Sequence, residues 1–293
     1  MNRLRRKAVV VFAVACFVFM AAAVAYRRSM AVSAMALLEN DGARMAMDLD
    51  RFGCPGILRT ERSSDLIVME GAHFNDRHVS LLRNLPSIVA VELRGASVSG
   101  VGVNILAQLD LSHIVLTDCP VSDSTLQRLT SSRGLNWVNL SGTRVTSVTC
   151  NRLARLPSLE SLDLSRSNVT EIAQQPSQFP RLTTMWLDSL ALSPNSFEHL
   201  SMISSLEYLS LRRTSVADRD IESFTNLVNL TELDLRDTAI TDVAIPALAK
   251  LPQLRYLYLT GSQVSASGAA ALRKLAPGID RVDLCPDRNT DHL

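Results

Sequence analysis

The stretch LTELDLRDTAIT, residues 230–241, is one copy of a pattern that recurs along most of this chain. Its leucine at 235 belongs to a column of leucines that stand 23 to 25 residues apart. Apolar residues recur two and five positions before each of these leucines, and a valine, leucine or isoleucine recurs five positions after all but the last. A self-similar period of this length is typical of solenoid proteins, in which stacked units share one core. The column consists of Leu93, Leu116, Leu140, Leu164, Leu187, Leu211, Leu235, Leu259 and Leu284.

Each copy predicts a short strand, a turn and a short helical segment. With the residue five places before the column leucine as position 1, positions 4 and 6 are apolar and position 5 is mostly polar, the alternation of a half-buried strand. A polar residue directly after the valine column predicts a helix N-cap, and prolines such as Pro157 and Pro252 end the helical segment. The predicted caps are Asn75, Ser99, Ser122, Thr146, Thr170, Ser193, Thr241 and Ser265, with Ala217 as the exception.

These elements predict parallel strands joined by right-handed crossovers, with every rung stabilised by its neighbours. A degenerate first copy begins near Ser64 and the last strand ends at Leu284, so we expect about ten rungs. Two rungs depart from the pattern. A proline-containing loop at 174–180 replaces one helix, and Leu190 with Pro194 predicts a local change of curvature in the next rung.

The pattern LxxLxLxxTxVT resembles the leucine-rich-repeat family over residues 64–285. It is most similar to the bacterial variety in which threonine or serine replaces the usual asparagine at position 9, here Thr143, Ser167, Thr214, Thr238 and Ser262. The resemblance implies an α/β fold, a right-handed leucine-rich-repeat solenoid with a parallel concave sheet. It also implies a protein-interaction scaffold, without indicating a particular partner.

The N-terminus predicts a membrane anchor. Residues 8–26 form an uncharged, mostly apolar run that would span about 28 Å as a helix, close to the thickness of a bilayer core. More basic residues precede the run than follow it, which predicts a cytoplasmic segment 1–7 and extracytoplasmic repeats. A cleaved signal peptide, which would give a secreted protein, is the alternative, because small residues suited to cleavage occur at 32–36.

Residues 27–63 are interpreted as either an N-terminal cap of the solenoid or a solvated stalk. An amphipathic pattern predicts a helix from 29 to about 52, with Gly53 suited to its C-terminal end. The repeats then occupy 64–285, and residues 286–293 form a polar tail.

Charge and cysteine usage exclude several classes of function. The net charge is +1, but the first 28 residues hold six of the 30 basic residues and no acidic one, so 24 basic residues face 29 acidic ones in the remainder, a charge of −5. This balance argues against a nucleic-acid partner. No CxxC pair occurs, Cys119 falls in a small inward position, and no disulfide framework is expected among Cys16, Cys54, Cys119, Cys150 and Cys285.

No motif indicates an enzyme, a metal site or a cofactor. His73 and His78 flank Asp76, but a polar loop explains them as well as a metal site does. His113 is predicted on the concave face without an evident serine or cysteine partner. We therefore expect no catalytic residues, no metal and no cofactor.

The concave face carries the functional prediction. Strand positions 3, 5 and 7 are expected to face solvent there, and they contain both tryptophans and three of the four tyrosines. Tryptophan, tyrosine and arginine dominate protein interfaces, whereas a purely structural aromatic ladder and a solvated salt-bridge patch are the alternatives. The predicted partner-binding residues are Trp137, Trp186, Tyr208, Tyr256, Tyr258, Asp188, Arg212 and Arg236.

The sequence thus predicts a membrane-tethered scaffold that binds a protein or peptide through its concave face. A structural envelope protein without a specific concave ligand is the alternative function.

Overall fold

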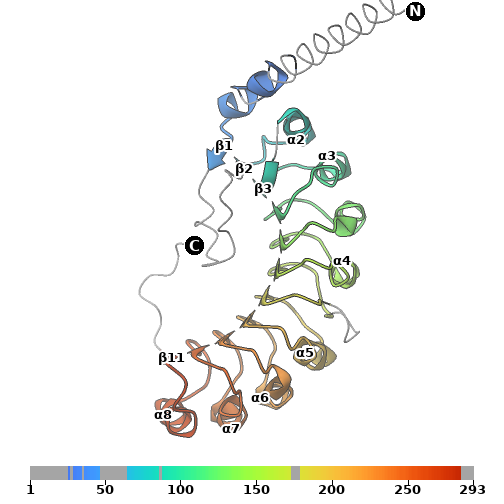
Figure 1. The fold of residues 1–293 in the computed structure, drawn as a ribbon. Helices are drawn as coiled ribbons and strands as arrows, with labels where there is room; N and C mark the ends of the chain where they lie inside the picture. The colour runs from blue at the N-terminus through green and yellow to red at the C-terminus, as the bar shows by residue number, and fades with distance from the viewer. Residues whose placement is uncertain are drawn as a thin grey trace, which may run out of the picture.

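The computed structural model describes residues 26, 29–34, 36–46, 65–85, 88–172 and 179–284. Within these residues the chain forms a curved array in which strands line the inner, concave side and helices lie on the outer, convex side (Figure 1). The predicted solenoid is therefore confirmed.

All strands belong to one sheet whose order follows the sequence. The first strand is antiparallel to the second, and the following ten are parallel with equivalent residues in register, so that Glu232, for example, lies between Tyr208 and Tyr256. The expected ten parallel rungs are thus present. The strands are β1 (Arg44–Ala46), β2 (Asp65–Glu70), β3 (Ile88–Arg94), β4 (His113–Val115), β5 (Trp137–Asn139), β6 (Ser161–Asp163), β7 (Thr184–Trp186), β8 (Tyr208–Ser210), β9 (Glu232–Asp234), β10 (Tyr256–Tyr258) and β11 (Arg281–Asp283).

The convex side is built from short helices that could not persist alone, because helices of this length are unstable without tertiary packing. The α-helices are α2 (Asp76–Leu81), α3 (Gly100–Leu106), α4 (Ser147–Leu153), α5 (Pro194–Ser201), α6 (Asp218–Ile221), α7 (Ile245–Leu248) and α8 (Ala266–Leu275). The 3-10 helices are η2 (Leu82–Asn84), η3 (Leu129–Ser131), η4 (Ser223–Asn226) and η5 (Asp242–Ala244).

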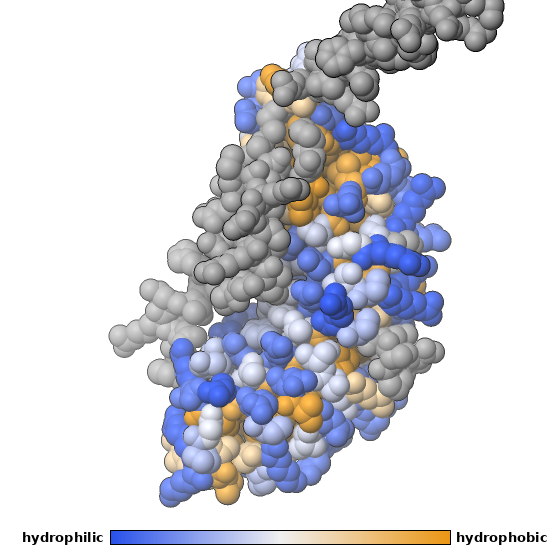
Figure 2. All heavy atoms as spheres, in the orientation of Figure 1, coloured by the Kyte–Doolittle hydropathy of each residue, from blue (hydrophilic) through white to orange (hydrophobic). Residues whose placement is uncertain are grey.

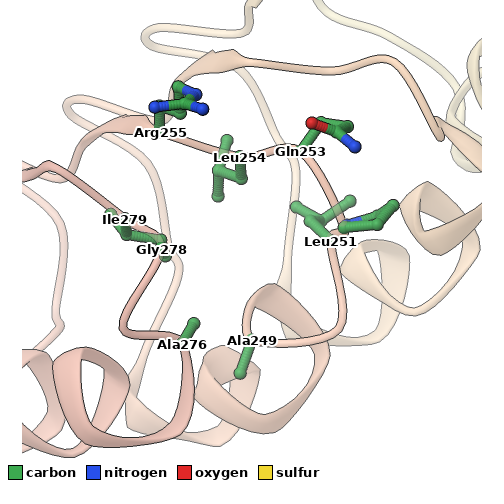
Figure 3. Close-up of a pocket in the computed structure, with 9 residues that line it drawn as sticks. Ala249, Leu251, Gln253, Leu254, Arg255, Ala276, Gly278 and Ile279 are labelled. Carbon is green, nitrogen blue, oxygen red and sulfur yellow. The ribbon is translucent and has the colours of Figure 1, made fainter.

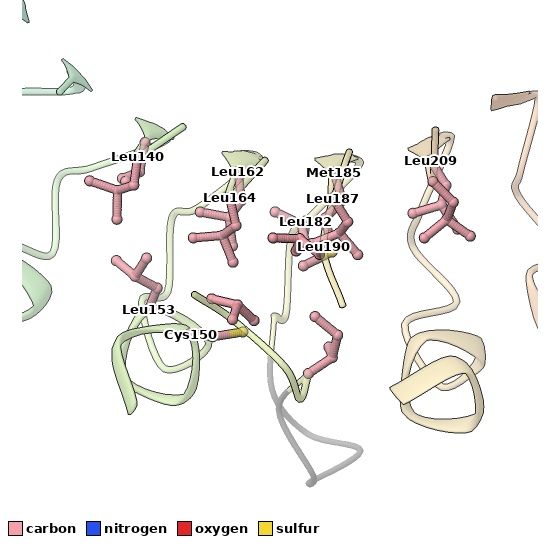
Figure 4. Packing of buried hydrophobic residues seen from close by; sticks show 14 of the residues in the cluster. Leu140, Cys150, Leu153, Leu162, Leu164, Leu182, Met185, Leu187, Leu190 and Leu209 are labelled. Carbon is pink, nitrogen blue, oxygen red and sulfur yellow. The ribbon is translucent and has the colours of Figure 1, made fainter. Parts of the chain in front are cut away.

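The leucine columns form the core between the two layers. Leu140, Leu162, Leu164 and Leu187 point from the strands toward the helical side, where Cys150 meets them from α4 (Figure 4). Each of these side chains is fully buried, and burial of one leucine stabilises the fold by about 1.5–3 kcal/mol. The expected buried thiol at Cys119 is also confirmed, and burial raises its pKa to about 11. The remaining predictions on Cys16, Cys54 and Cys285 lie outside the described residues.

The threonines at position 9 are inward-facing and satisfy the main chain of their own rung. The hydroxyls of Thr143, Thr214 and Thr238 each donate to the carbonyl of the column leucine three residues earlier, at 2.6 Å. These side chains are 3–8% exposed, so the hydrogen bond avoids an unpaired buried hydroxyl. Leu190 fills the same position in its own rung and is buried.

The residue at position 8, directly after the concave strand, adopts a left-handed conformation in rung after rung. Its φ lies between 55° and 112° in nine successive rungs. Glycine adopts this conformation without strain, whereas other residues lose about 1 kcal/mol or more. The residues are Gly71, Gly95, Asp118, Gly142, Arg166, Ser189, Arg213, Asp237 and Gly261.

The predicted N-cap column is confirmed at five positions. The side chains of Asn75, Ser99, Thr146, Thr241 and Ser265 accept a hydrogen bond from a backbone N–H of the following helix. The prediction is wrong at Ser193, whose side chain makes no cap hydrogen bond and whose hydroxyl contacts Ser196 Oγ at 3.1 Å instead.

The prediction is also wrong at Ser122, because the residues after it form turns that reach only the 3-10 helix η3. Thr125 explains the difference, since its hydroxyl accepts the Ser122 N–H at 2.8 Å. The predicted cap at Thr170 stays a prediction, because most of the segment after it lies outside the described residues. Residues 174–178 of the predicted loop lie outside them as well.

A second polar column connects the caps of neighbouring rungs. Asp123 follows Ser122, which holds the place of a cap in its rung, and accepts hydrogen bonds from the N–H and hydroxyl of Thr146, the cap of the next rung, at 3.0 and 2.7 Å. Asp76 and Asp242 do the same for Ser99 and Ser265. These carboxylates hold successive helices in register on the convex side.

The segment before the repeats covers the first rung. Helical residues end at Asn40, where Gly42 (φ +89°) takes the left-handed position and Ala43 N–H bonds Leu38 O at 2.8 Å, a Schellman ending. The prediction of one helix from 29 to about 52 is therefore wrong at 41–46, where Gly42 redirects the chain into β1, and residues 47–52 lie outside the described residues. Asp41 then bonds His78 Nε2 at 3.0 Å, which attaches this segment to α2.

No helix among the described residues is both long and apolar enough to cross a membrane. Apart from Tyr26, the predicted anchor at 8–26 lies outside those residues.

The glycines of α3 provide a test of the carboxylate column. A Cβ at Gly102 would lie 2.4 Å from Asp76 Oδ1 and 2.6 Å from Val98 Cγ1, whereas one at Gly100 would meet nothing closer than 3.8 Å. We expect Gly102→Ala to lower the free energy of unfolding by about 1–3 kcal/mol through this clash. Gly100→Ala in the same helix should leave stability unchanged or raised by up to about 1 kcal/mol. Urea denaturation followed by circular dichroism measures both, and equal effects would contradict the role given to Asp76.

Candidate functional site

The predicted binding residues all lie on the concave side, but they differ in exposure. Tyr256 is exposed at 40%, whereas Trp137 is only 7% exposed. The other six are partly buried: Trp186, Tyr208, Tyr258, Asp188, Arg212 and Arg236. The expectation that positions 3, 5 and 7 face solvent is therefore wrong for Trp137, which packs between neighbouring rings.

Four rings form a continuous row along the sheet, which we call the aromatic row: His113, Trp137, Trp186 and Tyr208. Successive ring centroids lie 6.0, 6.3 and 5.4 Å apart, and the two indoles are nearly parallel at 23°. The indoles come from β5 and β7 and meet across β6, where the small side chain of Ser161 is 1% exposed. Ring pairs of this kind stabilise a fold by about 0.5–1.5 kcal/mol each beyond burial. The row thus explains the burial of Trp137.

Tyr256 and Tyr258 lie apart from the aromatic row, on β10. The guanidinium groups of Arg236 and Arg281 stand 5.5 and 5.9 Å from the centre of the Tyr258 ring, within cation–π range. Burial and the neighbouring Glu232 raise the pKa of Tyr258 to about 12, so its hydroxyl stays protonated at neutral pH. The predicted residues are therefore divided between two regions of the concave surface.

The charged residues of the predicted set pair both within a rung and between rungs. Arg236 binds the buried carboxylate of Asp234 at 2.6 Å. Arg212 binds Asp237 at 3.1 Å and not its column neighbour Asp188. Asp188 accepts instead from Ser210 Oγ at 2.5 Å and from the backbone N–H of Arg212 at 3.2 Å.

A cleft of about 240 Å³ lies over β5 to β8 and the turns that follow them, and we call it the central cleft. It brings together Trp186, Asp188 and Arg212 of the predicted set. The other six lining residues, which include Asp163, Arg166 and Arg213, were not among the predicted binding residues, since alternation alone does not show which rungs leave space between side chains. The full lining is Ser141, Asp163, Ser165, Arg166, Trp186, Asp188, Ser189, Arg212 and Arg213.

The carboxylates of the central cleft have unusual acidities. Burial raises the pKa of Asp188 to about 6, and repulsion from Asp234 and Asp163 acts in the same direction. Burial also raises the pKa of Asp163. Both groups are thus poorly compensated as anions within the folded chain.

His113 ends the aromatic row and is almost fully buried. The sequence showed no evident serine partner, but the structure places Ser112 Oγ 2.6 Å from its Nδ1. Its Nε2 has no hydrogen-bond partner, and burial lowers its pKa to about 4. The imidazole is therefore neutral at physiological pH.

A second cleft of about 250 Å³ lies where α7 and α8 lead into β10 and β11 (Figure 3). Its lining is mainly apolar, including Leu251, Leu254, Ala276 and Ile279, with Arg255 as its charged member. It contains none of the predicted residues. Elsewhere, no described group of three or more His, Cys, Asp or Glu side chains could hold a metal ion, and His73 and His78 both bond Asp41.

The raised pKa of Asp188 predicts a pH dependence of stability. Between the unfolded value of 3.8 and the folded value of about 6, the folded chain keeps a proton that the unfolded chain releases, so this group lowers stability as the pH rises. The loss is at most about 3 kcal/mol. Asp188→Asn keeps an acceptor oxygen and cannot ionise, so its stability relative to the unaltered chain should increase from about pH 4 to about pH 7. Urea denaturation across this range tests it, with the exposed Asp280→Asn as control.

His113 predicts the opposite slope. The unfolded side chain binds a proton below pH 6.5, whereas the folded one does so only below about pH 4, so its contribution is present above pH 6.5 and is lost as the pH falls. His113→Phe removes this group and the unpaired Nε2. The variant should resist acid better by at most about 3 kcal/mol. Thermal denaturation at several pH values measures this, and an NMR titration of His113 with a midpoint near 6.5 would contradict it.

Comparisons with known proteins agree with this architecture. Residues 204–264 match the family model described as a leucine rich repeat. No curated protein sequence matches the chain. Internalin C2 from Listeria monocytogenes str. 4b F2365 is similar at 26% identity and a TM-score of 0.54, over 71% of this chain and 84% of that one.

A TLR13–ssRNA13 complex is similar at 22% identity and a TM-score of 0.51, over 74% of this chain and 32% of that chain, a likeness of fold alone. The chain therefore contains leucine-rich repeats and has the leucine-rich-repeat fold that its leucine column predicted.

Proposed function

We propose that this chain is a scaffold that binds a protein or peptide through its concave face. The observation that carries the proposal is the surface over β7 to β10, where aromatic rings stand beside arginines and next to the central cleft. Tyr256 and Tyr258 with Arg236 and Arg281 form the accessible part of this surface. Tyrosine, tryptophan and arginine contribute most of the binding free energy in protein interfaces. No enzymatic activity or cofactor is part of the proposal.

Part of the aromatic row stabilises the fold and is not available to a partner. Trp137 is buried and stacked, so it stabilises the sheet and offers little surface to a partner. The contact residues are therefore Trp186, Tyr208, Tyr256, Tyr258, Asp188, Arg212 and Arg236. A structural envelope protein without a concave ligand is the alternative that the experiment below separates.

We also propose that residues 8–26 tether the scaffold to a membrane, with residues 1–7 in the cytoplasm and the repeats outside. The support is the uncharged run and the basic cluster before it. Cleavage of this segment would give a secreted scaffold instead. Residues 27–63 would connect the tether to the repeats, and their later part would contribute to the cover of the first rung.

Nucleic acid is the partner class that we argue against. The TLR13 structure is a complex with single-stranded RNA, so the fold itself permits such a ligand. In this chain the residues after the first 28 carry a net charge of −5. Binding to phosphates depends on basic surface, which favours a protein or peptide partner here.

Photo-crosslinking in the native membrane tests the concave surface. Tyr256→Ser and Tyr258→Ser should each weaken capture of the partner about tenfold, the usual effect of removing an interface tyrosine. Val101→Ser and Val243→Ser are matched controls, because these side chains are 64% and 75% exposed at the starts of α3 and η5 on the convex side. They should leave capture unchanged.

The opposite pattern would overturn the proposal. If folded concave variants capture the same partners as the unaltered chain, the aromatic residues are structural. A gel-shift titration with single-stranded RNA completes the test, and saturable binding would contradict the exclusion of nucleic acid.

A further inference from the structure

The central cleft contains uncompensated charges of both signs, which separates it from the rest of the concave face. Elsewhere on this face Arg94, Arg236 and Arg281 pair with Glu92, Asp234 and Asp283 of their own strands or the residues just after them. The convex side is mainly hydrophilic, and hydrophobic residues are visible between the rungs (Figure 2). The central cleft therefore has a chemistry of its own.

The positive side of the central cleft comes from two adjacent arginines that share one carboxylate. Arg212 Nε and Arg213 Nε lie 3.1 and 3.2 Å from the same oxygen, Asp237 Oδ2. The two side chains are 37% and 61% exposed, and both line the cleft. One carboxylate faces two guanidinium groups, so this side retains a positive charge and exposed N–H donors for a carboxylate.

The negative side comes from Asp163 and Asp188. Within the described chain these carboxylates accept hydrogen bonds from Ser165 N at 2.9 Å and from Ser210 Oγ at 2.5 Å, and no ion pair of the described residues includes either one. Burial raises the pKa of both carboxylates, and the nearby Arg166 only partly offsets this effect at Asp163. An ammonium group placed here would restore both as anions.

The two sides are close together. Asp188 and Arg212 lie two residues after the ends of β7 and β8, which are hydrogen-bonded neighbours, and Arg212 N donates to Asp188 Oδ1 at 3.2 Å. Neighbouring strands lie about 4.8 Å apart, so a ligand that satisfies both sides must carry its opposite charges within a few bonds. Trp186 lines the same cleft and offers an apolar ring to the rest of the ligand.

We propose that the central cleft is a binding site for a free α-amino acid, with its carboxylate on Arg212 and Arg213, its ammonium group on Asp188 and Asp163, and its side chain against Trp186. The volume of about 240 Å³ accommodates a ligand of this size. This inference goes beyond the proposed scaffold function, since it concerns a small ligand and needs no macromolecular partner.

Fluorescence titration of the full-length chain tests the site. The protein has two tryptophans, so Trp137→Phe leaves Trp186 in the cleft as the single indole reporter. L-leucine should change its emission saturably, with a dissociation constant in about the millimolar range or below. N-acetyl-L-leucine lacks the ammonium group and L-leucinamide lacks the carboxylate, and each should bind at least about tenfold more weakly.

Substitutions test the binding of the ligand's carboxylate and of its ammonium group separately. Arg213→Gln should weaken leucine binding while Arg212 keeps its bond to Asp237, and Asp188→Asn should do the same through the ammonium group. Arg255→Gln is the matched control, because Arg255 is 58% exposed and pairs with Asp280 at 3.2 Å outside the central cleft. It should leave binding unchanged.

An unchanged spectrum with leucine, glycine and glutamine in the folded protein overturns the proposal. Binding of either blocked derivative as tightly as leucine overturns it as well, since that would show an apolar contact only. Neither result bears on capture of a protein by Tyr256 and Tyr258, so the two proposals fail independently.

Discussion

Most rungs of this protein contribute a concave strand of only three residues, and such a strand is stable only while it is hydrogen-bonded to a neighbouring rung. Every other regularity follows from this constraint. The inward leucines must repeat at one spacing so that successive rungs share a core, and the left-handed turn must return in each rung so that the chain leaves the strand in the same direction. On the concave side the strands hydrogen-bond neighbouring rungs together. On the convex side the carboxylates of Asp76, Asp123 and Asp242 do so through the cap residues of the next rung. The rungs are therefore held in register along both edges.

The period of the leucines was sufficient to predict the ten parallel rungs, because burial imposes one residue type at fixed positions. Contacts that several residue types can make were harder to predict. The turn position tolerates glycine, aspartate, arginine and serine, so it has no single-residue signature. The carboxylate column was missed for a similar reason, since Asp123 and Ser147 occupy equivalent places and both accept hydrogen bonds from the next rung. The helix end at Gly42 was also missed. The amphipathic pattern continues past this glycine, but its left-handed conformation ends the helix there.

The sequence predicted which residues lie on the concave face from their position in the repeat. In the structure, the contacts of these residues depend on how far their side chains extend over neighbouring rungs. Trp137 and Trp186 come from strands that are not adjacent, yet their rings meet because Ser161 between them is small. Burial of Trp137 follows from that neighbour and not from its own column. Arg212 likewise reaches Asp237 of the next rung and leaves Asp188 without a cation. Position along the strand predicted which face a residue occupies, whereas the size and charge of residues in neighbouring rungs decided its partners.

The left-handed residues at position 8 indicate where functional residues are concentrated. Gly71, Gly95, Gly142 and Gly261 show that glycine suits this position, and other residues are disfavoured there by about 1 kcal/mol or more. Four consecutive rungs nevertheless carry Arg166, Ser189, Arg213 and Asp237 at φ values of 55–58°. Three of these side chains line the central cleft, and the fourth holds its two arginines. Backbone strain of this kind concentrates at functional sites. Four of the five non-glycine residues at this turn position, all but Asp118, thus line the central cleft or contact its arginines, and what their side chains offer a ligand is a reason for keeping them there.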